Sequence, residues 1–199
     1  MSMVKRMSPP SAARTGVWVG IGAITMSFAA YTSAMVVRHG SIPEWQHFTL
    51  PPILYWNSLV LVASSVTLEL ARRRIGGPFD RLGHSESLLA AKSREWLSWY
   101  RITLALSFAF LVGQYLAWQR LASEGVYLAT SPSSSFFYVL TALHALHLLG
   151  GLGALVYALR CLRSDDGPRP VNVLAAAALY WHFMAVLWIY LLVVLALWV

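Results

Sequence analysis

Charge and cysteine are both scarce in this 199-residue sequence: Asp, Glu, Lys and Arg together make up 12% of it, and Cys161 is its single cysteine. One cysteine excludes an intrachain disulfide and a cluster of thiolate metal ligands, and with them a disulfide-stabilised secreted scaffold and an iron–sulfur protein. Hydrophobic residues, by contrast, reach 58%. A soluble domain is less apolar than this, so the composition indicates a membrane protein if the apolar residues cluster in long runs.

The apolar residues do cluster, in five stretches that are each long enough for the roughly 20 helical residues that cross a hydrocarbon core of about 30 Å. Unpaired backbone groups are costly in lipid, so we expect helices for such runs. We predict an all-α membrane protein with five transmembrane helices, made of a cytoplasmic tail over residues 1–15 and a single five-helix domain over residues 16–199. The predicted spans are residues 16–37, 52–70, 102–119, 134–159 and 173–198.

The basic residues are distributed unevenly between the two sides of these spans. Thirteen of the 15 Lys and Arg residues lie in the tail, between the second and third spans, or between the fourth and fifth spans. Arg38 and Arg120 alone lie on the opposite side. Because positively charged loops stay in the cytoplasm, we predict a cytoplasmic N-terminus and a periplasmic C-terminus. Topology thus explains the net charge of +7, and nucleic acid is not an expected partner.

Ionisable residues inside the spans are few. Glu69 is at the cytoplasmic end of the second span, three and four residues before Arg72 and Arg73, so the favoured interpretation is an interfacial ion pair. His144 and His147 share a helix face in the fourth span, and His182 lies in the fifth, so all three are expected near mid-bilayer.

The three histidines allow two interpretations. Two imidazoles from one helix and a third from a facing helix can ligate a metal ion. The favoured alternative is neutral histidines that form hydrogen bonds between helices or to hydroxyl groups such as those of Thr141 and Tyr180. A haem-binding cytochrome is disfavoured, because a second set of facing axial histidines is missing from the sequence.

Three segments resemble subunit III of the haem-copper cytochrome c oxidases. The first is GQYLAWQRLASEGVYLATSPSSSFFYVLTALHALHLLGG, which contains the Ser-Phe-Phe-Tyr, Thr and His-x-x-His pattern of that family. The second is YWHFMAVLWIYLLVVL, which is similar to the closing Tyr-Trp-His-Phe helix, and the third is LPPILYWNSLVLVASSVTLELARR. The matching positions are Pro51, Asn57, Ser64, Ser65, Arg72, Gln114, Trp118, Gly125, Ser135, Phe136, Phe137, Tyr138, Thr141, His144, His147, Gly150, Tyr180, Trp181, His182, Phe183 and Trp188.

This resemblance implies the short, five-helix bacterial form of a non-catalytic subunit III of a respiratory terminal oxidase in the bacterial inner membrane. It implies that haem and copper lie in the catalytic subunit I, and that this chain holds no cofactor, metal or catalytic residue but supports that subunit and binds phospholipid. The candidate interhelical or lipid-contact residues are Gln114, Trp118, Phe136, Tyr138, His144, His147, Trp181 and His182.

Two departures from the family pattern bear on function. Ile24 or Thr25 stands where the family carries a buried Glu, and Ala185 stands where an acidic residue often follows Tyr-Trp-His-Phe. A proton role for those carboxylates cannot be transferred, so we interpret the chain as a structural subunit. Two other functions stay open on the sequence alone: an accessory subunit of a nitric oxide reductase, which shares the fold, and a small membrane transporter.

Overall fold

A computed structural model describes residues 12–41, 45, 47–75, 86–163 and 170–199, with the backbone alone described at residues 12–13, 75, 86–94 and 170–172. Each of the five helices in these ranges is long and apolar enough to cross a membrane, as the sequence predicted. The helices are α1 (Ala12–Ser41), α2 (Ile53–Ile75), α3 (Glu86–Ser123), α4 (Pro132–Arg163) and α5 (Pro170–Trp198).

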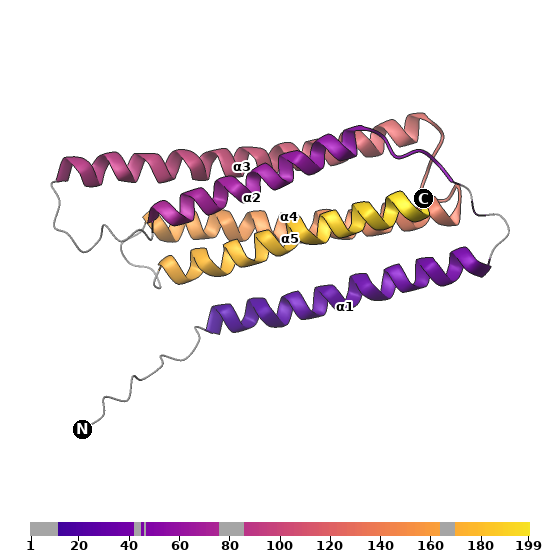
Figure 1. Ribbon diagram of the computed structural model, residues 1–199, viewed down its shortest axis with the longest axis horizontal. Coiled ribbons are helices and arrows are strands. Elements are labelled where there is room, and N and C mark those ends of the chain that lie inside the picture. Colours follow the sequence, from indigo (N-terminus) through magenta and orange to yellow (C-terminus); the bar gives the residue numbers. More distant parts are fainter. Residues whose placement is uncertain (1–11, 42–44, 46, 76–85, 164–169) are drawn as a thin grey trace, which may run out of the picture.

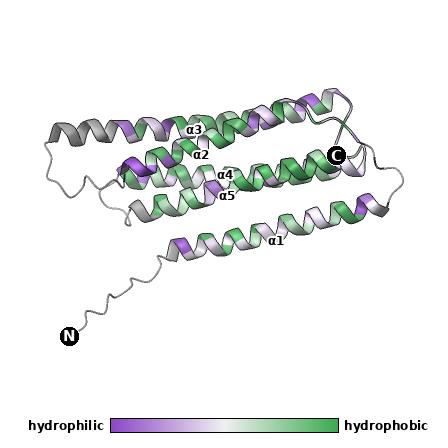
Figure 2. Cartoon of the chain, in the orientation of Figure 1, coloured by the Kyte–Doolittle hydropathy of each residue, from purple (hydrophilic) through white to green (hydrophobic). Residues whose placement is uncertain are grey.

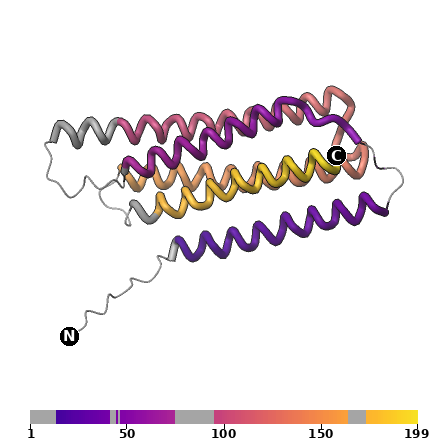
Figure 3. The backbone as a smooth tube through the Cα atoms, viewed as in Figure 1, coloured from indigo at the N-terminus to yellow at the C-terminus, as the bar shows by residue number. Residues whose placement is uncertain are grey.

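The helices run up and down in succession, with α1 at one edge of the bundle and α3 at the other (Figures 1 and 3). α2 packs mainly on α3 and α4 mainly on α5, so the bundle contains two closely packed pairs. The contact between α5 and α2 connects the two pairs, and α5 also contacts α1. α3 and α4, by contrast, touch over a small area. The backbone N–H of Phe48, which precedes α2, donates a 3.0 Å hydrogen bond to the carbonyl of Val199. This bond connects the segment before α2 to the residue that follows α5.

The observed helices extend beyond most of the predicted spans, most of all in α3. That helix begins at Glu86, sixteen residues before the predicted start at residue 102. Its first turns, ESLLAAKSREWLSWYR, carry good helix formers together with charged residues, so the helix continues where hydropathy no longer indicates a membrane span. Most of the predicted tail, residues 1–11, lies outside the described residues.

The start of α4 has a defined cap. Pro132 occupies the first helical position, where its missing N–H would have no helical partner. Ser131 is the capping residue, because its Oγ accepts a 3.2 Å hydrogen bond from the backbone N–H of Ser134. In return, the Oγ of Ser134 accepts a 3.0 Å hydrogen bond from the backbone N–H of Ser131. The cap thus lies one residue before the proline.

Polar residues gather at the helix ends and apolar residues along the middle of the bundle (Figure 2). Four of the described arginines, Arg72, Arg73, Arg74 and Arg160, lie at the end of the bundle where α1 begins. Long helices with apolar middles and charged ends suit a bilayer, where water is available only at the two surfaces.

Two glycines lie where neighbouring helices approach closely. A Cβ on Gly113 of α3 would lie 2.4 Å from Oδ1 of Asn57 on α2. A Cβ on Gly151 of α4 would lie 3.0 Å from a ring carbon of Tyr180 on α5. Small residues at such crossings let membrane helices pack backbone to backbone.

Candidate functional site: polar groups buried between the helices

Two indole groups of α5 donate hydrogen bonds to serines of α2. Trp181 Nε1 donates to Ser64 Oγ at 3.1 Å, and Trp188 Nε1 donates to Ser58 Oγ at 2.8 Å. Both tryptophans are almost fully buried. The two bonds lie about two helical turns apart and fix the rotation of α5 against α2, since each indole has a single donor.

A polar cluster links the same two helices nearer the end where the arginines lie. The ring Nδ1 of His182 is hydrogen-bonded to Ser65 Oγ, and its Nε2 lies 3.7 Å from Glu69 Oε2. Glu69 also forms ion pairs with Arg72 at 2.8 Å and Arg73 at 2.9 Å. The predicted interfacial ion pair is confirmed, and the structure adds an imidazole from a second helix to it.

His144 lies deeper in the bundle. Its side chain is completely buried, with its ring 5.0 Å from the ring of Trp188 and 6.2 Å from that of Phe110. Neither ring nitrogen has a hydrogen-bond partner among the described residues. The same is true of both amide atoms of Gln114, which is 2% exposed. These two side chains carry the unpaired buried side-chain atoms found in the described parts of the chain.

His147 lies one turn along α4 from His144 and has different surroundings. Its Nδ1 donates a 2.7 Å hydrogen bond to the backbone carbonyl of Leu143, and its ring packs edge-on against Phe28 of α1 at 5.8 Å. The hydroxyl of Tyr180 on α5 donates to the backbone carbonyl of His147 at 3.1 Å. His147 thus lies where α4 meets both α1 and α5.

The three membrane histidines therefore face three different neighbourhoods. His144 lies among aromatic rings, His147 bonds its own helix, and His182 bonds α2. In the described ranges, no group of three His, Cys, Asp or Glu side chains is placed to hold a metal ion. Their surroundings are those of helix packing, and the hydroxyl that His182 meets is Ser65 rather than Thr141 or Tyr180.

A third set of contacts closes the opposite end of the bundle. Trp118 Nε1 of α3 donates to Thr141 Oγ1 of α4 at 3.1 Å. The hydroxyl of Tyr138 donates to the carbonyl of Val126 at 2.8 Å, which holds the turn between α3 and α4.

Phe136 belongs to an aromatic group at this same end. Its ring lies 6.4 Å from that of Trp45, whose Nε1 donates a 2.8 Å hydrogen bond to the carbonyl of Trp198. His39 of α1 packs edge-on against both indoles, at 5.0 Å from Trp45 and 4.9 Å from Trp198. The group joins the ends of α1, α4 and α5.

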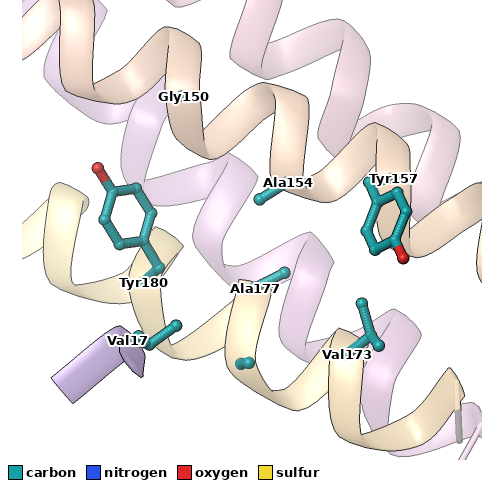
Figure 4. Close-up of a pocket in the computed structure, with 8 residues that line it drawn as sticks. Val17, Gly150, Ala154, Tyr157, Val173, Ala177 and Tyr180 are labelled. Carbon is teal, nitrogen blue, oxygen red and sulfur yellow. The ribbon is translucent and has the colours of Figure 1, made fainter. Parts of the chain in front are cut away.

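An apolar groove of about 580 Å³ lies between α1, α4 and α5. Figure 4 shows Tyr157 and Tyr180 at its two ends, with the small side chains of Ala154 and Ala177 between them and Val17 of α1 beside Tyr180. Its lining is mostly alkyl and aromatic carbon. The exposed Arg14 and Arg160 each lie three residues from a lining residue, toward the arginine-rich end.

Several of these features have no clear sequence signal. Tyr100 is fully buried and donates a 2.6 Å hydrogen bond to the carbonyl of Leu155, which ties α3 to α4. The sequence did not single it out, because an aromatic residue near a span end usually indicates an interfacial position. The pairing of His182 with Glu69 depends on the relative rotation of two helices that are far apart in the sequence.

Comparison with known proteins gives consistent matches. The model of the family described as Cytochrome c oxidase subunit III matches residues 24–199. Proteins named probable cytochrome c oxidase subunit 3 in Mycobacterium tuberculosis and cytochrome c oxidase subunit 3 in Corynebacterium diphtheriae are each 28% identical to this chain. The first alignment covers 98% of this chain and 92% of the relative, and the second covers 81% and 74%. A cytochrome c oxidase subunit 3 of Synechocystis is also 28% identical, over 89% of this chain and 72% of the relative.

Proposed function

The chain belongs to the cytochrome c oxidase subunit III family and is a multi-pass membrane subunit of a haem-copper oxidase, and we propose that it acts in that complex as a non-catalytic partner of subunit I. Membership implies a complex with other oxidase subunits. The observation that best supports a structural role is the separation of the three histidines, each of which is engaged in helix packing. Haem and copper are then held by other subunits.

The proposal includes a bound phospholipid. One acyl chain would fill the groove between α1, α4 and α5, where Ala154, Ala177 and Gly150 leave space beside larger side chains. Arg14 and Arg160 carry the charge that suits an anionic phosphate at the headgroup level, and long arginine side chains reach that level by snorkelling. This would cover a surface between helices that otherwise lies open at membrane depth.

We also propose the bacterial inner membrane as the location, with the N-terminus in the cytoplasm and the C-terminus in the periplasm. The support is the excess of basic residues at the end of the bundle where α1 begins. Cysteine accessibility would test it: a cysteine introduced at Arg120 should react with an impermeant thiol reagent in intact spheroplasts, and one introduced at Arg163 should react only after lysis.

The test of the function is purification of the complex from native membranes through an affinity tag on this chain. We expect a haem- and copper-containing subunit I to co-purify in equal amount, together with oxygen consumption driven by reduced cytochrome c. Recovery of the folded chain from native membranes without any haem protein would contradict the proposal. Mass spectrometry of the same sample should detect phospholipid that is lost from a variant with Ala154→Trp in the groove.

A further inference from the structure

Gln114 of α3 and His144 of α4 lie at the same level of the interface between their helices. α3 and α4 run in opposite directions (Figure 1), and two contacts fix their register. Trp118 Nε1 donates to Thr141 Oγ1 at 3.1 Å, and the ring of Phe110 lies 6.2 Å from that of His144. Gln114 is four residues from Phe110 and four from Trp118, so it shares their face of α3 and lies between these two contacts.

Both side chains are closed off from the outside of the bundle. Gln114 is 2% exposed and His144 is 0% exposed. Their four polar atoms, the amide oxygen and nitrogen and the two ring nitrogens, have no hydrogen-bond partner among the described residues and almost no accessible surface. Lipid, bulk water and a neighbouring subunit cannot reach these atoms. A partner for them must therefore lie inside the bundle, where an unpaired polar group is costly.

The polar groups beside this pair are already bonded. The indole of Trp118 donates to Thr141, and the indole of Trp188, whose ring lies 5.0 Å from that of His144, donates to Ser58 at 2.8 Å. The amide and the imidazole are complementary to each other. A neutral imidazole has one donor and one acceptor, and an amide has both a carbonyl oxygen and N–H groups.

The interface between α3 and α4 leaves room for a small movement. The terminal torsion of a glutamine side chain has broad, shallow preferences, so the amide of Gln114 can turn at little cost. α3 and α4 belong to different closely packed pairs and touch over a small area. A slight approach of the two pairs at this interface therefore disturbs few packing contacts.

We propose that Gln114 and His144 form a polar latch, in which the amide turns toward the ring and closes a direct hydrogen bond between α3 and α4. An N–H of Gln114 donates to the unprotonated ring nitrogen, or the ring N–H donates to Oε1 of Gln114. The conformation described above, with four unpaired atoms, is the open latch. The closed latch joins the α2–α3 pair to the α4–α5 pair in the membrane interior. Because both residues belong to this chain, the inference goes beyond the proposed function and does not depend on it.

A double-mutant cycle on the full-length chain in detergent tests the latch. Gln114→Leu and His144→Phe each remove one partner and leave the other unpaired, so each should weaken folding, as measured by labelling of the buried Cys161 on unfolding. Their combined effect should fall short of the product of the single effects on the folding equilibrium constant by roughly 3- to 18-fold, the range for an interhelical hydrogen bond in a membrane.

Gln119→Leu is the matched control for the cycle. Gln119 is exposed and its amide bonds Tyr115 on its own helix, so its replacement should show no coupling with His144→Phe. Independent effects of Gln114→Leu and His144→Phe, or single variants as stable as the wild type, would overturn the proposal.

A high-resolution density map of the wild-type chain in its complex provides a second test that needs no variant. We expect an amide atom of Gln114 about 3 Å from a ring nitrogen of His144. The neighbouring bond between Trp118 and Thr141 is the reference for hydrogen-bond distances in the same map. A water molecule between the two side chains, or an amide that still has no partner, would overturn the direct bond and leave the assignment of the subunit unchanged.

Discussion

Replacing Gly113 with alanine should separate α2 from α3, the most closely packed pair of helices in the bundle. The new Cβ would lie 2.4 Å from Oδ1 and 2.8 Å from Cγ of Asn57, which is 4% exposed. Relief requires movement of Asn57, whose Nδ2 donates a 2.9 Å hydrogen bond to the carbonyl of Phe110. Overpacking costs about 1 to 3 kcal/mol and the lost hydrogen bond about 1 kcal/mol, so we expect a loss of about 2 to 4 kcal/mol.

The single cysteine of the chain provides the assay. Cys161 is 7% exposed, so a thiol-reactive fluorophore should label it only as the protein unfolds on heating in detergent. For a chain of this size the Gly113→Ala variant should unfold roughly 4 to 16 °C below the wild type. Gly153→Ala is the matched control, since a Cβ there meets nothing within 4 Å, and its midpoint should stay near that of the wild type.

A double variant tests the stated cause. Asn57→Ala removes the side chain that the new methyl group would strike, so Gly113→Ala should be less damaging in that background than in the wild type. If Gly113→Ala unfolds at the same temperature as Gly153→Ala, or if its effect is unchanged beside Asn57→Ala, the reasoning from close approach is refuted.

Three further contacts can be probed by substitution with the same assay. Tyr100→Phe removes a buried hydroxyl that donates to a backbone carbonyl of α4, and should lower stability by about 1 kcal/mol; an unchanged midpoint would contradict this bond. Trp188→Phe should lower stability by at least as much, because it removes the indole N–H that donates to Ser58 and leaves unfilled space. The loss of stability in the double variant with Ser58→Ala should be smaller than the sum of the two single losses. Glu69→Gln should lower stability by less than about 1 kcal/mol, because its partner Arg72 is 45% exposed. The difference in stability from the wild type should shrink at high salt. A larger loss of stability that salt does not change would refute the ion-pair assignment.

The positions of the helices followed from the sequence, because long uncharged runs leave a chain few alternatives in lipid. The early start of α3 at Glu86 did not, since charged residues hide a helix that extends beyond the membrane. The resemblance to the oxidase family gave candidate contact residues, among them Gln114 and His144, but not their surroundings. Those surroundings depend on how each helix is rotated, which single-sequence hydropathy does not encode.

His182 illustrates the same limit. Its residue type and depth were plain from the sequence, and a hydrogen bond to another helix was the favoured interpretation. Its partners, Ser65 and Glu69 of α2, could be named only when α2 and α5 were seen side by side. The unpaired amide of Gln114 is a still stronger case, because only a structure reveals that a buried polar group lacks a partner.

The central claim is that this chain is an oxidase subunit without a redox centre, and the distribution of haem after dissociation tests it most directly. The tag-purified complex should be separated by mild detergent into this chain and the remaining subunits, and each fraction should be scanned for Soret absorbance and assayed for copper. We predict that both stay entirely with the remaining subunits, while this chain stays folded, with Cys161 protected. Haem that remains with the folded chain, and is lost when His144 or His147 is replaced, would contradict the account.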